Sequence, residues 1–241
     1  MNPVFLIARR DLGAYLFGLT GYVIVAAILF MNGLAFQAFA LGRGAQYSHE
    51  VLEQFFLWTF GFTVAVSLLL TMRSIAEERQ TGTDTVLNTA PVTDGQIVLG
   101  KYLAAMGVVT LFLALTTYMP ALIFVRGKVA VAQVAVGYIG LLLAGSTSAA
   151  IGIFGSSLFK SQVAAVIISG VIAITLTICW LLSQIADPPF DDVIAYMALF
   201  DKHFVPFQTG RLSSAGTVFF GSLTFLFLHL TTKVLEGRRW Q

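Results

Sequence analysis

The chain has 241 residues, of which 57% are hydrophobic and 11% are charged, and its mean hydropathy is +0.85. Soluble domains carry about 25% charged residues, so this composition excludes an ordinary soluble enzyme or binding domain. The net charge of +2 does not suggest a nucleic-acid partner, and the single cysteine, Cys179, cannot form an intrachain disulfide.

Six apolar runs are long enough to cross a bilayer, which takes about 20 consecutive apolar residues. They cover residues 20–41, 54–72, 102–125, 129–159, 161–186 and 212–232. The first run is too long for a cleavable signal peptide, and no small-residue cleavage site follows it. The fourth run holds five glycines, so we expect part of it to bend or to lie outside the hydrocarbon. The sequence therefore predicts an all-α membrane protein, with residues 1–241 forming one domain of six spans.

Residues 1–19 precede the first span and have the pattern of an interfacial helix. Within residues 3–17 the apolar side chains Phe5, Ala8, Leu12 and Leu16 recur at helical spacing. Arg9 and Arg10 lie elsewhere on the turn, where they suit anionic lipid headgroups. The alternative is that this segment simply begins the first span.

Residues 73–101 form the long polar stretch of the chain, between the second and third spans. Arg73 and Glu77 are four residues apart, so they can pair where the second helix continues past the membrane. Gly82 is suited to ending that helix. A polar segment of this kind between two spans predicts either a docking element for a partner in the cytosol or a solvated loop that reverses the chain.

A short helix is expected within this stretch. Thr83 or Asp84 can cap a helix from residue 85 to residue 89, and Pro91 ends it. Thr93 or Asp94 then caps the helix that runs through Lys101 into the third span. Because both ends of the short helix are tied to spans, its movement would be transmitted to them.

Hydroxyl side chains on spans three to five are candidates for lining a path. They are Thr116, Thr117, Tyr118, Ser146, Thr147, Ser148, Thr175 and Thr177. The alternative is that they make hydrogen bonds between helices. Pro120 is expected to kink or loosen the third span.

Residues 187–211 precede the last span. Asp187 followed by Pro188 is a favourable helix start. The apolar residues Phe190, Val193, Ile194 and Met197 then form a stripe. This segment predicts short re-entrant helices or, alternatively, an ordinary external loop.

Lysine and arginine in the short loops indicate the orientation. With the N-terminus inside, nine lie inside: Arg9, Arg10, Arg73, Arg79, Lys101, Lys160, Lys233, Arg238 and Arg239. Five lie outside: Arg43, Arg126, Lys128, Lys202 and Arg211. This count predicts that both termini and residues 73–101 are cytosolic.

The polar stretch resembles the segment after the second helix in ABC-2 type permeases, the membrane subunits of a class of ATP-binding-cassette exporters. The matching residues are Glu77, Glu78, Gly82, Thr83, Leu87, Ala90, Pro91, Val92, Thr93, Gly100 and Lys101. The chain departs from the pattern at Thr85, where the family commonly has glutamate, and Asp84 is a possible substitute. Residues 150–167 resemble the family's segment between helices four and five, with departures at Phe159 and Ser161. The C-terminal part resembles the gliding-motility-associated subgroup.

This resemblance implies a non-catalytic permease subunit in the bacterial inner membrane. It implies a separate ABC ATPase dimer, which binds ATP and magnesium, and a second permease chain that is identical or related. The residues expected to couple to the ATPase are Glu77, Glu78, Arg79, Gly82, Thr83, Asp84, Leu87 and Pro91. No Gly-x-x-x-x-Gly-Lys-Ser/Thr phosphate loop occurs in the sequence, and no cofactor or metal is expected in this chain.

Two functions of other classes remain as alternatives. An intramembrane serine protease would need Ser146 beside His229, but the supporting Gly-x-Ser-Gly pattern is absent. An ion-coupled secondary transporter would normally carry an ionisable group inside the membrane. Here His229 is the candidate, and a neutral hydrogen-bonded histidine is the expected state. The cargo is expected to be a lipid or another amphipathic molecule, unless the complex transmits force to a periplasmic partner.

Overall fold

The computed structural model describes residues 3–41, 47–83, 92–126, 130–186 and 190–238, which are almost entirely helical and contain no strand. The elements are α1 (Pro3–Phe17), α2 (Leu19–Ala35), the π-helix η1 (Phe36–Leu41), α3 (Ser48–Thr71), α4 (Ala76–Thr81), α6 (Asp94–Thr116), α7 (Tyr118–Arg126), α8 (Val131–Leu158), α9 (Gln162–Ser183), α10 (Phe190–Tyr196), the π-helix η2 (Leu199–Phe204), α11 (Val205–Gln208) and α12 (Ser214–Arg238).

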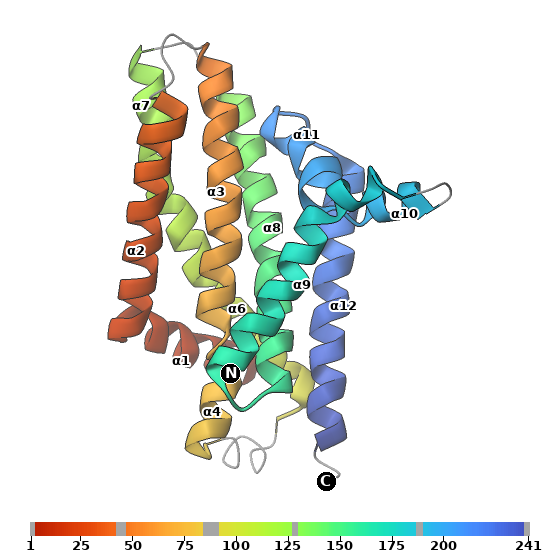
Figure 1. Ribbon diagram of the computed structural model, residues 1–241. Coiled ribbons are helices and arrows are strands. Elements are labelled where there is room, and N and C mark those ends of the chain that lie inside the picture. Colours follow the sequence, from red (N-terminus) through yellow and green to blue (C-terminus); the bar gives the residue numbers. More distant parts are fainter. Residues whose placement is uncertain (1–2, 42–46, 84–91, 127–129, 187–189, 239–241) are drawn as a thin grey trace.

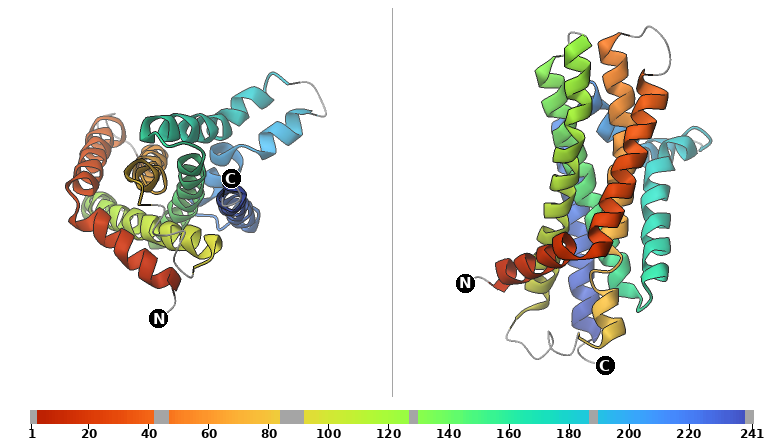
Figure 2. Two further views of the ribbon diagram at one scale, coloured as in Figure 1. Left: turned by 90° about the horizontal axis from the view of Figure 1, so that it is seen from below. Right: turned by 90° about the vertical axis from the view of Figure 1, so that its left-hand side faces the viewer.

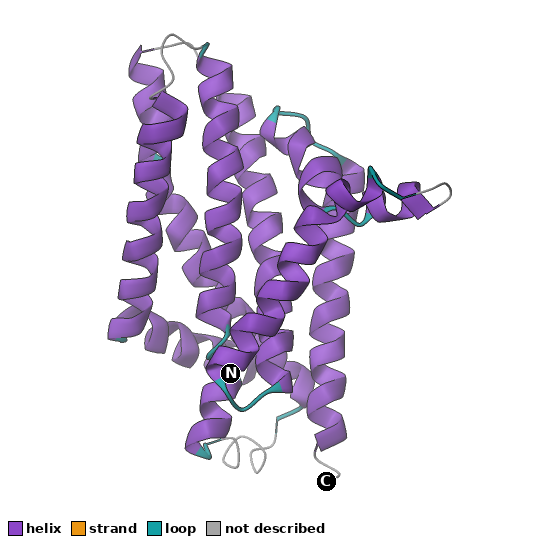
Figure 3. Cartoon of the chain, viewed as in Figure 1, coloured by secondary structure: helices purple, strands orange, loops and turns teal. Residues whose placement is uncertain are grey.

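Within these ranges six helical stretches are long and apolar enough to cross a membrane. They are Leu19–Leu41, Ser48–Thr81, Asp94–Phe124, Val131–Leu158, Gln162–Ser183 and Ser214–Arg238. The predicted all-α membrane fold with six spans is therefore confirmed. The long helices run roughly along one direction (Figures 1 and 3). The first helix, α1, lies across the lower end of this bundle, the end toward which α12 also runs (Figure 2).

Helix α8 lies at the centre of the bundle and packs most extensively against α3 and α12. It is one continuous helix of 28 residues, so its glycines do not interrupt it. These glycines instead face neighbouring elements. A Cβ atom on Gly137 would meet Phe56, and one on Gly152 would meet Thr71. At 1.5 Å per residue the helix is about 42 Å long, which exceeds a hydrocarbon core of about 30 Å.

A buried stripe of hydroxyl residues on α3 faces two of these glycines, Gly145 and Gly152. Thr63, Ser67 and Thr71 each donate a hydrogen bond to the carbonyl oxygen four residues earlier, at 2.6–2.7 Å. Internal bonds of this kind satisfy the hydroxyls without water. Small side chains then let α3 and α8 approach closely, as is usual between membrane helices.

The third span is interrupted where the sequence predicts a kink. Helix α6 ends at Thr116, and α7 begins at Tyr118, two residues before Pro120. Proline has no N–H, and its ring crowds the carbonyl four residues earlier, which here belongs to Thr116. The Thr117 N–H turns to the carbonyl of Ala114 at 3.2 Å.

The N-terminal segment forms a helix of its own, α1, which is separated from α2 by a sharp elbow at Gly18. Gly21 makes this elbow possible, because a Cβ atom there would run into the backbone of Tyr15. Ile7 and Ala8 are buried, and Ile7 lies against Gly100 of α6. The bundle-facing side of α1 thus includes Ile7, whereas Phe5 of the predicted stripe is 61% exposed.

The described part of 187–211 is helical, as α10, η2 and α11. Asp187 and Pro188, the predicted helix start, lie outside the described residues. Helix α10 packs on α9 and projects away from the bundle (Figure 1). Phe190 and Val193 of its predicted stripe are more than 60% exposed. How deep this segment lies in the bilayer stays a prediction.

Candidate functional site

The lower end of the bundle in Figure 1 gathers the charged residues that the sequence singled out. We call it the polar end. It is formed by α1, α4, the first turns of α6 and the turn between α8 and α9. Here α3 does not simply continue past the membrane as expected. It ends at Thr71, residues 72–75 form turns, and α4 begins at Ala76.

Ser156 of α8 stabilises this break. Its fully buried hydroxyl accepts hydrogen bonds from the N–H groups of Ile75 at 3.0 Å and Ala76 at 2.9 Å, and donates to the carbonyl of Met72 at 3.0 Å. The first N–H groups of a helix need such an acceptor, which is usually a side chain at the N-cap. Ile75, the N-cap residue of α4, cannot supply one, so a serine from another helix does. The start of α4 therefore depends on α8.

Lys101 is the centre of the polar end. Its side chain is only 2% exposed. Its ammonium nitrogen lies 3.1 Å from Oδ2 of Asp11, 2.8 Å from Oε1 of Glu78 and 2.6 Å from the carbonyl oxygen of Ser74. A lysine ammonium has three hydrogens, and these three acceptors come from α1, α4 and the turn at 72–75. A single buried cation thus joins three parts of the chain to α6.

Arg10 completes the group from the exposed side. Its Nε donates to Oδ1 of Asp11 at 2.7 Å, and its Nη2 donates to Oε1 of Glu78 at 2.8 Å. Arg10, Asp11, Glu78 and Lys101, which we call the ion cluster, contain two positive and two negative charges. Balanced charge and complete hydrogen bonding are what partly buried ions require. Sequence reasoning selected Glu78 but missed its partners.

A second set of contacts connects α4 and α12 to the end of α8 and the start of α9. Arg79 donates to the carbonyl of Ser157 at 3.1 Å, and Arg238 of α12 donates to the carbonyl of Leu158 at 3.0 Å. The amide of Gln162 lies 3.3 Å from that of Gln80. Consequently α4 is held by α1 and α6 through Glu78, and by α8 and α9 through its neighbours.

The end of α4 and the start of α6 form as predicted. Gly82 adopts the left-handed conformation, with φ of +73°, and the N–H of Thr83 donates to the carbonyl of Glu78 at 2.9 Å. Thr93 caps α6 in a reciprocal box with Gln96. The predicted short helix between them lies outside the described residues, as do Asp84, Leu87 and Pro91.

Five of the candidate path-lining residues fall into two groups. Thr116, Ser146 and Thr147 make hydrogen bonds between helices, to Tyr138, Thr224 and Phe220 among others. Thr117 and Thr175 lie on the exposed surface of the bundle. The alternative that the sequence left open, interhelical hydrogen bonding, thus describes the first three.

An apolar groove runs along the outer side of the bundle between α3, α9 and η2, with a volume of about 530 Å³. It is lined by aromatic and aliphatic side chains that include Trp58, Phe60, Ile174 and Phe200, together with Thr177. Trp58 also stacks on Phe39, with ring centroids 4.5 Å apart. The groove offers an apolar surface of a size that suits a lipid chain or a neighbouring helix.

The residues of the protease alternative are not brought together. Ser146 lies 2.7 Å from the hydroxyl of Tyr102 and 3.1 Å from that of Thr224. His229 is on the exposed side of α12, where it stacks on Phe225. Within the described part of the chain its ring makes this stacking contact, and the hydrogen bond expected for it is not seen. Among the described residues no group of three or more His, Cys, Asp or Glu side chains could hold a metal ion.

Comparison with known proteins indicates the family of the chain. No curated protein matches the chain in a sequence search. A family model described as "ABC-2 family transporter protein" matches residues 16–198, which is more than half of the chain and covers the elements from α2 to α10. With six candidate spans, the chain is a multi-pass membrane protein of the ABC-2 transporter family.

Proposed function

We propose that the chain is the permease subunit of an ATP-driven ABC complex, in which a separate ATPase subunit drives export of a substrate or transfer of force across the membrane. Family membership supports the permease role. The sequence has no phosphate loop, so ATP and magnesium would be bound by the ATPase. The observation that carries the proposal is the ion cluster, because it connects α4, in the polar segment after α3, to α1 and to α6.

Within the polar end, contact and transmission are assigned to different residues. Gln80, Thr81, Gly82 and Thr83 are exposed at the tip of α4. Together with the segment that follows up to Pro91, they would form the docking surface for the ATPase. Glu78 and Arg79 bind the bundle itself, so they would transmit movement instead of touching the partner. Glu77 is 43% exposed and pairs with Arg73, so it could contact the partner and also transmit movement.

Movement of α4 would reach the spans through two connections. Glu78 and Lys101 connect it to α6 and, through Asp11, to α1. Ser156 connects its first turn to α8. A push on the tip of α4 would then shift α1 and α6 together with α8 as a unit. This requires residues 73–101 and both termini to face the cytosol, as the distribution of lysine and arginine predicts.

The complex is proposed to contain two permease chains over an ATPase dimer. The second chain would be identical or related, and the resemblance to the gliding-motility-associated subgroup favours a related one. The groove between α3 and α9 would face the seam between the two chains. An amphipathic cargo or a lipid would suit its apolar lining, and a periplasmic partner would replace the cargo if the complex transmits force.

The docking assignment is tested with the complex that co-purifies in mild detergent. Leu87→Asp on the proposed docking surface should release the ATPase, while Glu78→Gln should leave the ATPase bound but abolish its coupling to the permease. The matched control is Glu236→Gln, which breaks the exposed Lys233–Glu236 pair on α12 and should change neither property.

Orientation is checked in intact cells and in sealed inside-out membrane vesicles, where the membrane still separates the two sides. A cysteine at Gln80 should react with a membrane-impermeant maleimide only from the cytosolic side, and the bound ATPase should protect it. Co-purification and coupled ATP hydrolysis that stay unchanged in both Leu87→Asp and Glu78→Gln would refute the assignment. Labelling of Gln80→Cys from the outside would refute the orientation.

A further inference from the structure

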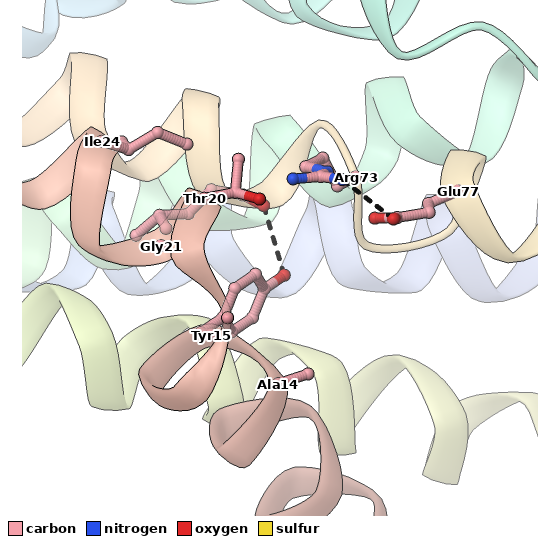
Figure 4. A pocket seen from close by; sticks show the side chains of 9 residues that line it. Ala14, Tyr15, Thr20, Gly21, Ile24, Arg73 and Glu77 are labelled. Carbon is pink, nitrogen blue, oxygen red and sulfur yellow. Dashed lines mark hydrogen bonds and ion pairs between the residues drawn. The ribbon is translucent and has the colours of Figure 1, made fainter.

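A small pocket lies between the α1–α2 elbow and the break after α3, with a volume of about 250 Å³. Figure 4 shows Tyr15 and Thr20 on the elbow side, and Arg73 with Glu77 on the other. Ile24 and Leu70, which belong to the first two spans, form its apolar wall. The pocket therefore lies at the boundary where two apolar spans give way to charged residues, which is the level of lipid headgroups.

Two opposite charges lie side by side in this pocket. Nη2 of Arg73 is 2.9 Å from Oε1 of Glu77. The two side chains are 25% and 43% exposed, so both remain accessible to a ligand. Nε of Arg73 is buried and has no acceptor among the described residues. The exposed part of the Arg73 guanidinium is suited to binding a phosphate oxygen, and the neighbouring carboxylate is suited to binding a cation.

The tyrosine in the pocket completes its polar side. The hydroxyl of Tyr15 donates to the carbonyl of Leu70 at 3.2 Å. Burial raises the pKa of Tyr15 above its ordinary value, with the nearby Asp11 carboxylate acting in the same direction. The ring therefore stays neutral and adds no second negative charge. Thr20 supplies a further hydroxyl from α2.

We propose that this pocket binds the headgroup of a phospholipid with a primary amine, of the phosphoethanolamine class, with its phosphate against Arg73 and its ammonium against Glu77. A primary ammonium donates hydrogen bonds to a carboxylate, which a quaternary ammonium cannot do. Quaternary groups are usually held by cages of several aromatic rings, and Tyr15 is the one aromatic side chain among the described residues that line this pocket. An anionic headgroup without an amine would leave Glu77 facing like charge.

Such a lipid would connect the elbow to α4. Its headgroup would contact α2 through Thr20 and the start of α4 through Glu77, one residue from Glu78 of the ion cluster. The acyl chains would extend from the pocket along Ile24 and Leu70 into the bilayer. The lipid would thus stabilise the arrangement of α1, α2 and α4 without taking part in docking the ATPase. This inference does not depend on the proposed function.

The test uses the purified full-length chain in detergent. Native mass spectrometry counts the lipid that the chain retains after addition of dioleoyl phosphatidylethanolamine, phosphatidylcholine or phosphatidylglycerol in equal amounts. We expect the phosphatidylethanolamine to be retained roughly tenfold better than either other lipid, a preference of ~1.4 kcal/mol. Glu77→Gln should abolish the preference over phosphatidylcholine while phospholipid binding persists. Arg73→Gln should weaken the binding of all three lipids.

Controls separate the pocket from general effects. Glu236→Gln removes a carboxylate from an exposed ion pair elsewhere and should keep the preference. If Arg73→Gln fails to fold, Arg73→Lys is used in its place. This variant retains the charge and should bind phospholipid more weakly than the natural chain. Equal retention of the three lipids by the natural chain, or an unchanged preference in Glu77→Gln, would overturn the proposal. Free phosphoethanolamine that displaces the lipid at equal concentration would overturn it in favour of a soluble ligand.

Discussion

At the scale of single residues, Lys101 explains why the polar end holds together. A cation that is 2% exposed is stable only if every one of its hydrogens is bound, and Asp11, Glu78 and the Ser74 carbonyl provide the three acceptors. Removing one partner of a buried pair typically costs about 3–5 kcal/mol, because the other charge is left uncompensated. The first role of Glu78 is therefore structural: it neutralises the buried charge of Lys101.

His203 carries a prediction about pH. Its side chain is 2% exposed, stacks on Phe219 with centroids 3.7 Å apart, and has Nε2 2.8 Å from the carbonyl of Tyr196. Burial lowers the pKa of His203 below its ordinary value of 6.5. The bond to Tyr196 opposes this shift, and the charge of Lys202 adds to it. The unfolded chain thus binds more protons than the native one at pH values below that ordinary value, so native stability falls as the pH drops through 6.5.

We expect the melting temperature in detergent to decrease from pH 7.5 to pH 5.5, and to decrease less in His203→Phe, which keeps the ring contact but cannot take up a proton. His229→Phe is the matched control, since His229 also stacks on a phenylalanine but is exposed. Its pH dependence should equal that of the natural chain. Equal slopes in His203→Phe and in the natural chain would contradict the assignment.

At the scale of elements, contacts between neighbours in sequence were predictable and contacts between distant segments were not. The cap at Thr93 and the end of α4 at Gly82 depend on residues within one helical turn, so the sequence pattern was sufficient. The break at 72–75 depends on Ser156, about 80 residues away along the chain. Nothing in the local pattern signals this contact, and the sequence therefore predicted a helix that simply continued.

The glycines of α8 have a packing role that the sequence pattern did not indicate. Their number suggested a bend, because glycine weakens an isolated helix. In the bundle three of them, Gly137, Gly145 and Gly152, are sites of close approach to α3, and a Cβ atom at Gly152 would overlap Thr71. The spacing of glycines in the sequence cannot distinguish a bend from close packing, since close packing depends on which helix lies against α8.

This packing gives a prediction. Gly152→Ala should lower the melting temperature in detergent, because extra atoms in a well-packed interior typically cost about 1–3 kcal/mol. Gly170→Ala on α9 is the matched control, since a Cβ atom added there would have no neighbouring atom within 4 Å. It should leave the melting temperature unchanged or raise it, as alanine is the better helix former. Equal effects of the two substitutions would show that close approach of α3 and α8 does not limit stability.

At the scale of the whole molecule, the six spans followed from composition and run length, because the bilayer imposes both. The order in which the spans pack did not follow, since apolar side chains face lipid and protein alike. Trp58 and Ile174 illustrate this. They lie on different spans and line one groove. The residues beside each of them in the sequence give no sign that the two spans meet there.

The same groove leads to the last prediction, on assembly. A single chain presents α3 and α9 on one outer side, and Ile174 is 58% exposed there. An ATPase dimer that closes on nucleotide would move two copies of α4, so two permease chains would meet along this side.

A photoactivatable benzophenone attached to Gly61→Cys, in a Cys179→Ser background, should crosslink to a second permease chain. The same probe at Val218→Cys on α12, which is 69% exposed, should label mainly lipid. Once the seam is crosslinked, ATP-driven turnover should stop, because the two chains can no longer separate. An active complex that contains one permease chain, or crosslinks to protein that are as frequent from α12 as from α3, would refute this arrangement.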